Sequence, residues 1–336
     1  MTALTANDLQ HALGPKGLAG EISDLRRLTG GANKESWYFR LHTPAGATAY
    51  VLRRNTGSQA EMSDAGGFTQ PEIHAEGQLI KALQNTGLKL PRVLAEFQAD
   101  SSVGDAFLMT CEQGESLPGK ILNLDKFTVA RQNLATQCGQ QLALLHSLDL
   151  SEQDLTQLEV DFSTAERVDD LAAASERLGN TSAVLELGLQ WLKNNIPNSD
   201  RRCVVHGDFR LGNLLVTEDG LSSILDWELA RLSHPEEDLG YISANTWRFG
   251  MPQNPVGGFG QYEELLDAYE QSAGWRPELA AIKFWQFFTT VGWGIICLTM
   301  RQMYLDGSDR SLERLAVGRR FSAAEVDILL LLDELA

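Results

Sequence analysis

Basic residues are scarce in this chain of 336 residues: 28 Lys and Arg are outnumbered by 45 Asp and Glu, which gives a net charge of −17. An acidic surplus of this size opposes binding to nucleic acid and to anionic membrane surfaces. We therefore expect neither of them as a partner. The surplus also gives a weak indication of a cationic substrate, although solubility alone explains it as well.

Cysteines are few and widely separated. The four of them, Cys111, Cys138, Cys203 and Cys297, have no spacing that suits a zinc site or a disulfide framework. The N-terminus also lacks the basic region followed by an apolar region that marks a secretory signal. These absences predict reduced thiols in a cytoplasmic protein.

Long apolar runs are missing with one exception, residues 284–300. This run has about 17 residues, the lower limit for a membrane span. Gln286 and two glycines interrupt it, and Lys283 and Arg301 close it. We therefore predict a buried core helix, with no membrane partner.

The first third of the chain has the pattern of an antiparallel sheet with one inserted helix. Aromatic and β-branched residues between turn signals are typical of strands, whereas apolar residues repeat with helical spacing between Pro71 and Gly87. A polar, glycine-rich loop is expected at 55–70. The first strand is predicted to begin at Leu25. The other strands are predicted to cover 37–41, 49–54, 91–94 and 106–109.

The remainder of the chain is predicted to be mainly helical. We therefore expect an α+β protein of two lobes, with a first lobe at 1–110, a hinge at 111–118 and a second lobe at 119–336. The predicted helices of the second lobe cover 127–148, 164–177, 183–194, 259–273, 277–304, 309–317 and 322–335.

Two polar stretches, each following an apolar segment, carry the chemistry. In the first, His206, Asp208 and Asn213 lie between two apolar runs; in the second, Asp226 and Glu228 follow Ile224. An acid, an amide five residues later and a second acid at the next strand end form the arrangement that protein kinases use to hold Mg²⁺ and to orient a hydroxyl. An Asp and an Asn at strand ends can also simply cap turns.

These residues carry a resemblance to a known family. The stretch 206–213 resembles the HGD-x4-N motif of the aminoglycoside phosphotransferase and choline kinase-like family, whose members have a two-lobed, protein-kinase-like fold. The longer match, over 206–216, 225–230 and 234–241, is similar to members found beside or fused to acyl-CoA dehydrogenases.

The resemblance implies transfer of the γ-phosphoryl group of ATP, with Mg²⁺, to a hydroxyl of a small molecule. It favours a hydroxyacyl-CoA or a hydroxy acid as acceptor. An aminoglycoside or an amino alcohol such as choline remains an alternative. A catalytically weak, nucleotide-binding pseudokinase that serves as an interaction module is an alternative of another class.

Roles in the second lobe follow from matching positions of the motif. The resemblance implies that Asp208 is the base, that Asn213 and Asp226 bind metal, and that His206 braces the catalytic loop. Arg210 is expected to contact the transferred phosphate, because a guanidinium suits a phosphoryl group; a surface ion pair is its simpler explanation. Glu228 is either a metal contact or a salt-bridged acid, and Asp238 matches a residue that steadies the loop.

In the first lobe, the turn with Gly30, Gly31 and Asn33 resembles the one that covers the phosphates. Arg53 stands where the family has a lysine, and Glu76 matches the helix partner of that lysine. The two could also form a plain ion pair, and the bulkier arginine leaves ATP or GTP open as donor. The segment 109–113, with Met109 and Cys111, is expected to read the adenine edge. The aromatic cluster of Trp285, Phe287, Phe288 and Trp293 is expected in the core, unless part of it lines an acceptor pocket.

Overall fold

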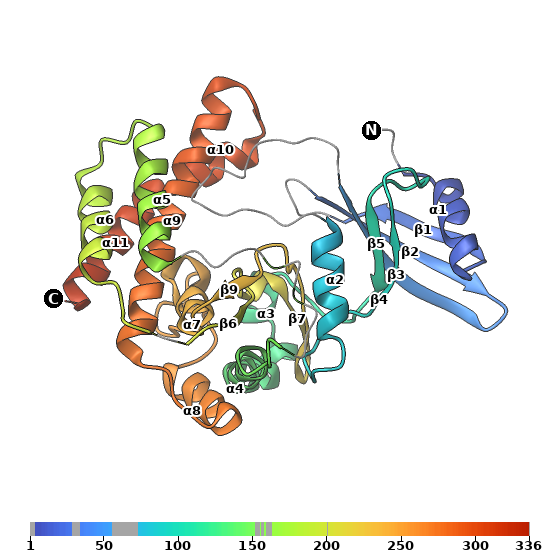
Figure 1. Cartoon of the computed structure of the whole chain (residues 1–336), viewed down its shortest axis with the longest axis horizontal. Coiled ribbons are helices and arrows are strands. Elements are labelled where there is room, and N and C mark those ends of the chain that lie inside the picture. The colour runs from blue at the N-terminus through green and yellow to red at the C-terminus, as the bar shows by residue number, and fades with distance from the viewer. Residues whose placement is uncertain are drawn as a thin grey trace.

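The computed structural model describes residues 4–28, 34–55, 73–151, 155, 158, 163–199 and 201–335. Figure 1 shows a sheet-rich lobe that contains the N-terminal residues and a larger, mainly helical lobe that contains the C-terminal residues. This arrangement confirms the predicted α+β architecture. The predicted loop at 55–70 lies, from residue 56 onward, outside the described residues.

The first lobe is built on a five-stranded antiparallel sheet with the strand order β1-β2-β3-β5-β4. The predicted first strand begins too late, because pairing with β2 extends β1 back to Glu21, which lies opposite His42. The strands are β1 (Glu21–Arg27), β2 (Lys34–Thr43), β3 (Gly46–Asn55), β4 (Val93–Phe97) and β5 (Ala106–Thr110).

The two faces of this sheet bury different helices. Side chains alternate along a strand, so Ala106 and Leu108 join the apolar cluster of α1 (Ala6–Leu13), while Phe107 joins that of α2 (Ile73–Leu83). A Cβ at Gly77 would lie 3.1 Å from the Phe107 ring, so a glycine at this position lets α2 approach the sheet closely. This close approach also brings Glu76, the preceding residue of α2, next to the strands of the sheet.

The second lobe combines short strands with helices around them (Figure 1). Its strands are β6 (Cys203–Val205), β7 (Leu214–Thr217), β8 (Gly220–Ile224) and β9 (Arg231–Ser233). Its helices are α3 (Pro118–Asn123), α4 (Thr128–His146), α5 (Thr164–Arg177), α6 (Ala183–Asn194), α7 (Glu236–Ser243), α8 (Tyr262–Ala273), α9 (Leu279–Asp306), α10 (Leu312–Gly318) and α11 (Phe321–Leu335). Short 3-10 turns cover Gly14–Lys16, Asp125–Phe127, Leu211–Asn213 and Asn245–Arg248.

Helix α9 contains the long apolar run of the sequence. Among the described residues it is the one helix long and apolar enough to cross a membrane, and 72% of its most apolar window is buried in the protein. It packs against α5, α6, α7, α10 and α11. The predicted core helix is therefore confirmed.

One apolar cluster extends across both lobes. It includes Leu79 and Ile80 of α2 together with Leu142 of α4 and Phe209 of the catalytic loop. The segment between β5 and α3, where we predicted the hinge, is tied to the second lobe, because Glu115 N–H donates to the Val216 carbonyl at 2.9 Å and Val216 N–H donates back at 3.0 Å. The lobes thus share packing close to the site.

Candidate active site

The loop after β6 places a carboxylate between two donors. Asn213 Nδ2 donates to Asp208 Oδ2 at 2.6 Å and to the Asp208 carbonyl at 2.9 Å. Arg210 Nε donates to Asp208 Oδ1 at 2.9 Å. Both carboxylate oxygens are therefore held, and charge-assisted bonds of this kind fix orientation strongly. The structure brings these three predicted residues together.

His206 lies beneath this loop and is fully buried. Its Nε2 lies 2.9 Å from the Leu225 carbonyl, so this nitrogen carries the proton, and Nδ1 accepts from the Asp208 N–H at 3.2 Å. The ring also packs 4.7 Å from that of Trp227. His206 therefore links the Asp208 loop to the segment before Asp226, as a brace would.

Asp238, at the start of α7, holds the same loop from the other side. Its carboxylate accepts the His206 N–H at 2.7 Å and the Gly207 N–H at 2.9 Å. His146 Nε2 lies 3.2 Å from it, and His146 Nδ1 lies 3.0 Å from the Tyr269 hydroxyl. This chain of contacts ties the loop to α4 and α8.

Gly207 has two reasons to be glycine. Its φ is +79°, in the left-handed region that favours glycine. A Cβ there would lie 2.3 Å from the Leu229 carbonyl oxygen and 2.5 Å from Arg231 Nη1. The loop can therefore pass close to residues 229–231 only without a side chain.

Arg53 of β3 joins the two lobes. Its Nε lies 3.0 Å from the Glu76 carboxylate, and its Nη2 lies 2.5 Å from Asp226 Oδ1 and 2.9 Å from Glu228 Oε2. Although burial lowers the pKa of Arg53, the three carboxylates raise it above its ordinary value. The Arg53–Glu76 pair is thus present, and the arginine also reaches the carboxylates expected to bind metal.

The two acids beside Arg53 differ in their pKa. Burial and the nearby charge of Asp226 raise the pKa of Glu228 to about 7. Burial opposes ionisation of Asp226 as well, but Arg53 lowers the pKa of Asp226 below its ordinary value. Asp226 also has φ +66°, a conformation that non-glycine residues adopt mostly at functional or strained positions.

The donor set suits Mg²⁺ by its chemistry. Among the described residues, no three His, Cys, Asp or Glu side chains form a metal cluster. Mg²⁺, however, is typically held by one or two carboxylates together with the phosphates of a nucleotide. Asn213 accepts the Leu225 N–H on its backbone carbonyl at 2.8 Å, so the backbone of Asn213 pairs with the residue that precedes Asp226.

The structure describes the segment 109–113, which was predicted to read the adenine edge, but not the predicted glycine turn. Met109 lies in β5 between β3 and β4, and the Cys111 N–H donates to the Ala49 carbonyl at 3.4 Å. Burial raises the pKa of the half-buried Cys111 thiol, and Glu112 adds to this. Gly30, Gly31 and Asn33 lie outside the described residues.

An aromatic pocket of about 50 Å³ adjoins the catalytic loop at Gly207. Trp285, Phe287 and Phe288 are core residues, as predicted, and Phe288 also lines the pocket together with Trp293. Its lining residues are Gly207, Leu229, Glu237, Tyr241, Trp247, Phe288, Thr289, Gly292, Trp293 and Ile296.

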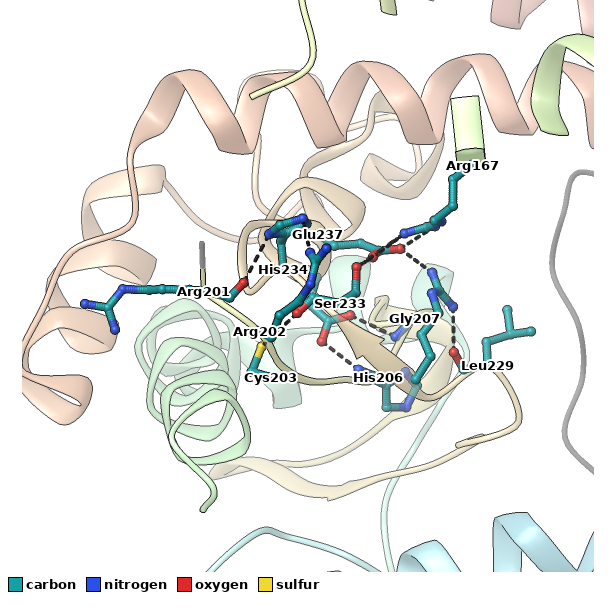
Figure 2. A network of polar contacts seen from close by, with 12 residues as sticks. Arg167, Arg201, Arg202, Cys203, His206, Gly207, Leu229, Ser233, His234 and Glu237 are labelled. Atoms are coloured by element: carbon teal, nitrogen blue, oxygen red, sulfur yellow. Dashed lines mark hydrogen bonds and ion pairs between the residues drawn. The ribbon is translucent and has the colours of Figure 1, made fainter. Parts of the chain in front are cut away.

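Glu237 is the charged residue of this wall, and its charge is neutralised. Arg167 donates to both carboxylate oxygens, at 2.6 and 2.7 Å, and Arg231 also contacts it (Figure 2). Ser233 Oγ donates to it at 2.5 Å. Burial by itself would raise the pKa of Glu237, but the two arginines lower it well below its ordinary value.

Several residues of the site escaped the sequence analysis. Lys34 is buried and donates to Glu76 at 3.0 Å, with Glu228 3.7 Å away. Its position next to the glycine turn was the available signal. Tyr241 faces Asp208, and burial followed by the Asp208 charge raises its pKa well above the ordinary value. Its spacing of four from Glu237 on α7 places both on the pocket face.

Comparison with known proteins identifies the family. The model of the phosphotransferase enzyme family matches residues 24–277. The chain belongs to this family. Among curated relatives of this phosphotransferase, chicken acyl-CoA dehydrogenase family member 11 is 29% identical over 301 residues, which cover 80% of the chain and 35% of that protein. The chain spans between 21% and 35% of the length of the curated relatives it matches.

Solved structures share the fold of this phosphotransferase. A Ralstonia eutropha JMP134 protein, proposed to be an aminoglycoside phosphotransferase, superposes with a TM-score of 0.76 at 22% identity, covering 99% of both chains. Spectinomycin phosphotransferase, solved with ADP and spectinomycin, has a TM-score of 0.65 at 17% identity, covering 98% of this chain and 99% of its own. The kinase-like fold inferred from the motif is thereby confirmed.

Proposed function

We propose that this phosphotransferase moves the γ-phosphoryl group of ATP, with Mg²⁺, to a hydroxyl of a small molecule. The observation that carries the proposal is the held carboxylate of Asp208, fixed by Asn213 and Arg210. A nucleotide donor is supported by the ADP complex of the structurally similar spectinomycin enzyme.

The chain's own residues divide the work. Asp208 orients the acceptor hydroxyl and takes its proton while the oxygen bonds to phosphorus and the bond to ADP breaks. Arg53 and Arg210 hold phosphate charge, and Glu76 positions Arg53. Mg²⁺ would be held by Asn213 and Asp226, with Glu228 as a further oxygen, and would neutralise phosphate charge.

The remaining nucleotide contacts come from the first lobe. We assign the covering turn of the phosphates to Gly30, Gly31 and Asn33 and the adenine edge to the backbone near Met109 and Cys111. With these assignments we propose a nucleotide-binding lobe at 1–110, a hinge at 111–118 and a catalytic lobe at 119–336.

For the acceptor we propose an anionic hydroxy compound, a hydroxyacyl-CoA or a related hydroxy acid. Two guanidiniums flank the aromatic pocket: Arg210 Cζ lies 4.8 Å from the Trp247 ring centre and Arg320 Cζ lies 5.6 Å from that of Trp293. The acid of the pocket, Glu237, is neutralised by Arg167 and Arg231. The match to acyl-CoA dehydrogenase family members supports the same class.

An aminoglycoside or amino-alcohol acceptor is the second candidate, favoured by the net charge of −17. A panel of hydroxyacyl-CoAs, choline and kanamycin, assayed by ADP release, separates the two. We expect turnover with a hydroxyacyl-CoA, and a KM for it raised about tenfold or more by Arg320→Ala, since a charge-assisted hydrogen bond contributes about 1.5–3 kcal/mol. Arg319→Ala, at the adjacent exposed position, is the control.

Turnover with the cationic compounds alone would contradict the acceptor assignment. The pseudokinase alternative is supported by Arg53, because this arginine pairs with the carboxylates of both Asp226 and Glu228, which are the groups proposed to bind metal. We would accept this alternative if Mg·ATP raised the melting temperature of the protein while no compound of the panel was phosphorylated and no ATP was hydrolysed.

A further inference from the structure

A second and much larger hollow, which we call the back cleft, lies across α7 from the aromatic pocket. It has a volume of about 1020 Å³, and Trp191, Arg201, Glu236, Trp275, Glu278 and Phe284 are among its lining residues. Consecutive residues of α7 separate it from the aromatic pocket, because Glu236 lines the back cleft and Glu237 lines the pocket. Figure 2 shows the Arg201 side chain directed away from Arg167 and Glu237.

The floor of the back cleft is aromatic. Trp191 of α6 stacks on Phe284 of α9, with ring centres 6.2 Å apart and planes inclined by 28°. Trp275 also lines the cleft, half-buried against Tyr269 with ring centres 5.3 Å apart. Half-buried tryptophans in the lining suit the flat or apolar body of a small molecule, since such sites are mostly aromatic with few polar groups.

Glu236 is the polar group that this wall leaves unsatisfied. Its side chain is 5% exposed, and within the described part of the chain its Oε2 has no hydrogen-bond partner. A buried acceptor without a donor is costly. Burial raises the pKa of Glu236; His146 and Arg201 oppose this, whereas Glu278 adds to it.

The charges around Glu236 favour a cation as its missing partner. Of the basic residues of the cleft, Arg276 is held by Asp267 and Glu270, and Lys283 by Glu334. Arg201 lies over Trp275, with its Cζ 4.1 Å from the ring centre. Glu236 and Glu278 thus add negative charge beside aromatic faces, and that combination attracts ammonium groups.

We propose that the back cleft binds a small molecule with an ammonium group and an aromatic or apolar body, the ammonium donating to Glu236 and the body lying between Trp191 and Trp275. This site is separate from the aromatic pocket and from the nucleotide site. Its residue Glu236 lies on helix α7, which also carries Asp238. The Asp238 carboxylate accepts two N–H groups of the loop that holds Asp208.

Dansylcadaverine, which joins a primary ammonium to a naphthalene ring, is a suitable probe, followed by fluorescence anisotropy with the intact chain. We expect saturable binding, weakened at least tenfold by Glu236→Gln and, independently, by Trp275→Ala. Dansylamide, which lacks the ammonium, should bind at least tenfold more weakly. Thermal melting of each variant checks that it is folded, and Trp275→Ala keeps the test decisive if Glu236→Gln does not fold.

Trp293→Ala, in the wall of the aromatic pocket, is the matched control and should leave probe affinity unchanged. The proposal is overturned if wild-type protein fails to bind the probe at millimolar concentration. Equal affinity of wild type and the folded Glu236→Gln and Trp275→Ala variants would also overturn it. So would loss of binding in Trp293→Ala, because the probe would then occupy the aromatic pocket.

Discussion

At the scale of single residues, Asp208 has its two carboxylate oxygens occupied by different donors. Asn213 holds one and Arg210 the other, while Tyr241 lies beside the pair. Two held oxygens fix the orientation of this carboxylate, which is what the proposed role of Asp208 as the base requires.

Replacement of Asp208 tests its role. We expect Asp208→Asn to lower kcat by about a hundredfold to ten-thousandfold, the usual contribution of a general base, and to leave ATP affinity within a factor of about three. Steady-state assays and equilibrium binding of ATP measure the two effects. Asp219→Asn, an exposed acid between β7 and β8, is the control; near-normal turnover of Asp208→Asn would refute the assignment.

Arg53 offers a second test at this scale. Loss of its guanidinium should raise the KM for ATP about ten- to a hundredfold, because hydrogen bonds to charged groups contribute about 1.5–3 kcal/mol. The comparison is Arg53→Met against Arg40→Met, which removes an arginine from the exposed part of β2. An unaltered KM in Arg53→Met would show that the arginine serves only its ion pairs.

At the scale of elements, the catalytic loop depends on close backbone approach. Gly207→Ala would place a methyl group against the Leu229 carbonyl in a left-handed conformation. We expect a loss of about 1–3 kcal/mol of unfolding free energy and a fall in kcat, measured by urea denaturation and by assay. Gly119→Ala, in open space on α3, should be neutral or slightly stabilising.

The second test at this scale concerns the connection of α5, β9 and α7 through Glu237 (Figure 2). At neutral pH, Glu237→Gln should destabilise the fold by about 3–5 kcal/mol, because it leaves buried arginines without their carboxylate. The pKa of Glu237 is lowered in the folded state. Its contribution to the free energy of unfolding is therefore fully present above pH 4.5, the ordinary pKa of a glutamate, and is lost as the pH falls below that value.

Urea denaturation should therefore be measured from neutral pH down to acid pH. We expect the free energies of unfolding of the wild type and of Glu237→Gln to converge as the pH falls. Glu270→Gln is the control, because its ion pair with Arg276 is exposed and should contribute less than about 1 kcal/mol. A constant difference between the curves down to low pH would contradict the ionised state assigned to Glu237.

At the scale of the whole molecule, the lobes meet through an apolar cluster and through Arg53. A nucleotide bound between them should stabilise the fold. At one hundred times its Kd, Mg·ATP should add about 2.7 kcal/mol to the free energy of unfolding. Thermal melting should show that Mg·ATP raises the melting temperature and that Mg²⁺ alone does not. EDTA and the substitution Asp226→Asn should each make this rise smaller. An equal rise in the presence of EDTA would show that nucleotide binding does not require the metal.

Most elements could be predicted because their signals are local. The aromatic strand at 37–41, the helix carrying Glu76 and the long apolar helix α9 follow from periodicity within a few turns. The start of β1 was missed because Ile22 stands alone among polar residues, so that pairing with β2 rather than a local apolar pattern defines this part of the strand. Residues such as Trp247 and Arg320 carry no local signal, since their neighbours are distant in the chain.

The sequence by itself determined the motif spacing, and with it the family and the two-lobed fold, because Asp208, Asn213 and Asp226 belong to one short stretch of loops and strands. Only the tertiary structure decided which groups surround them. Arg53 meets Asp226 across 173 positions of the chain, and helix α9 brings Trp293 to the catalytic loop. Packing of the apolar faces sets those distances, and for that reason the aromatic pocket and the back cleft are properties of the fold.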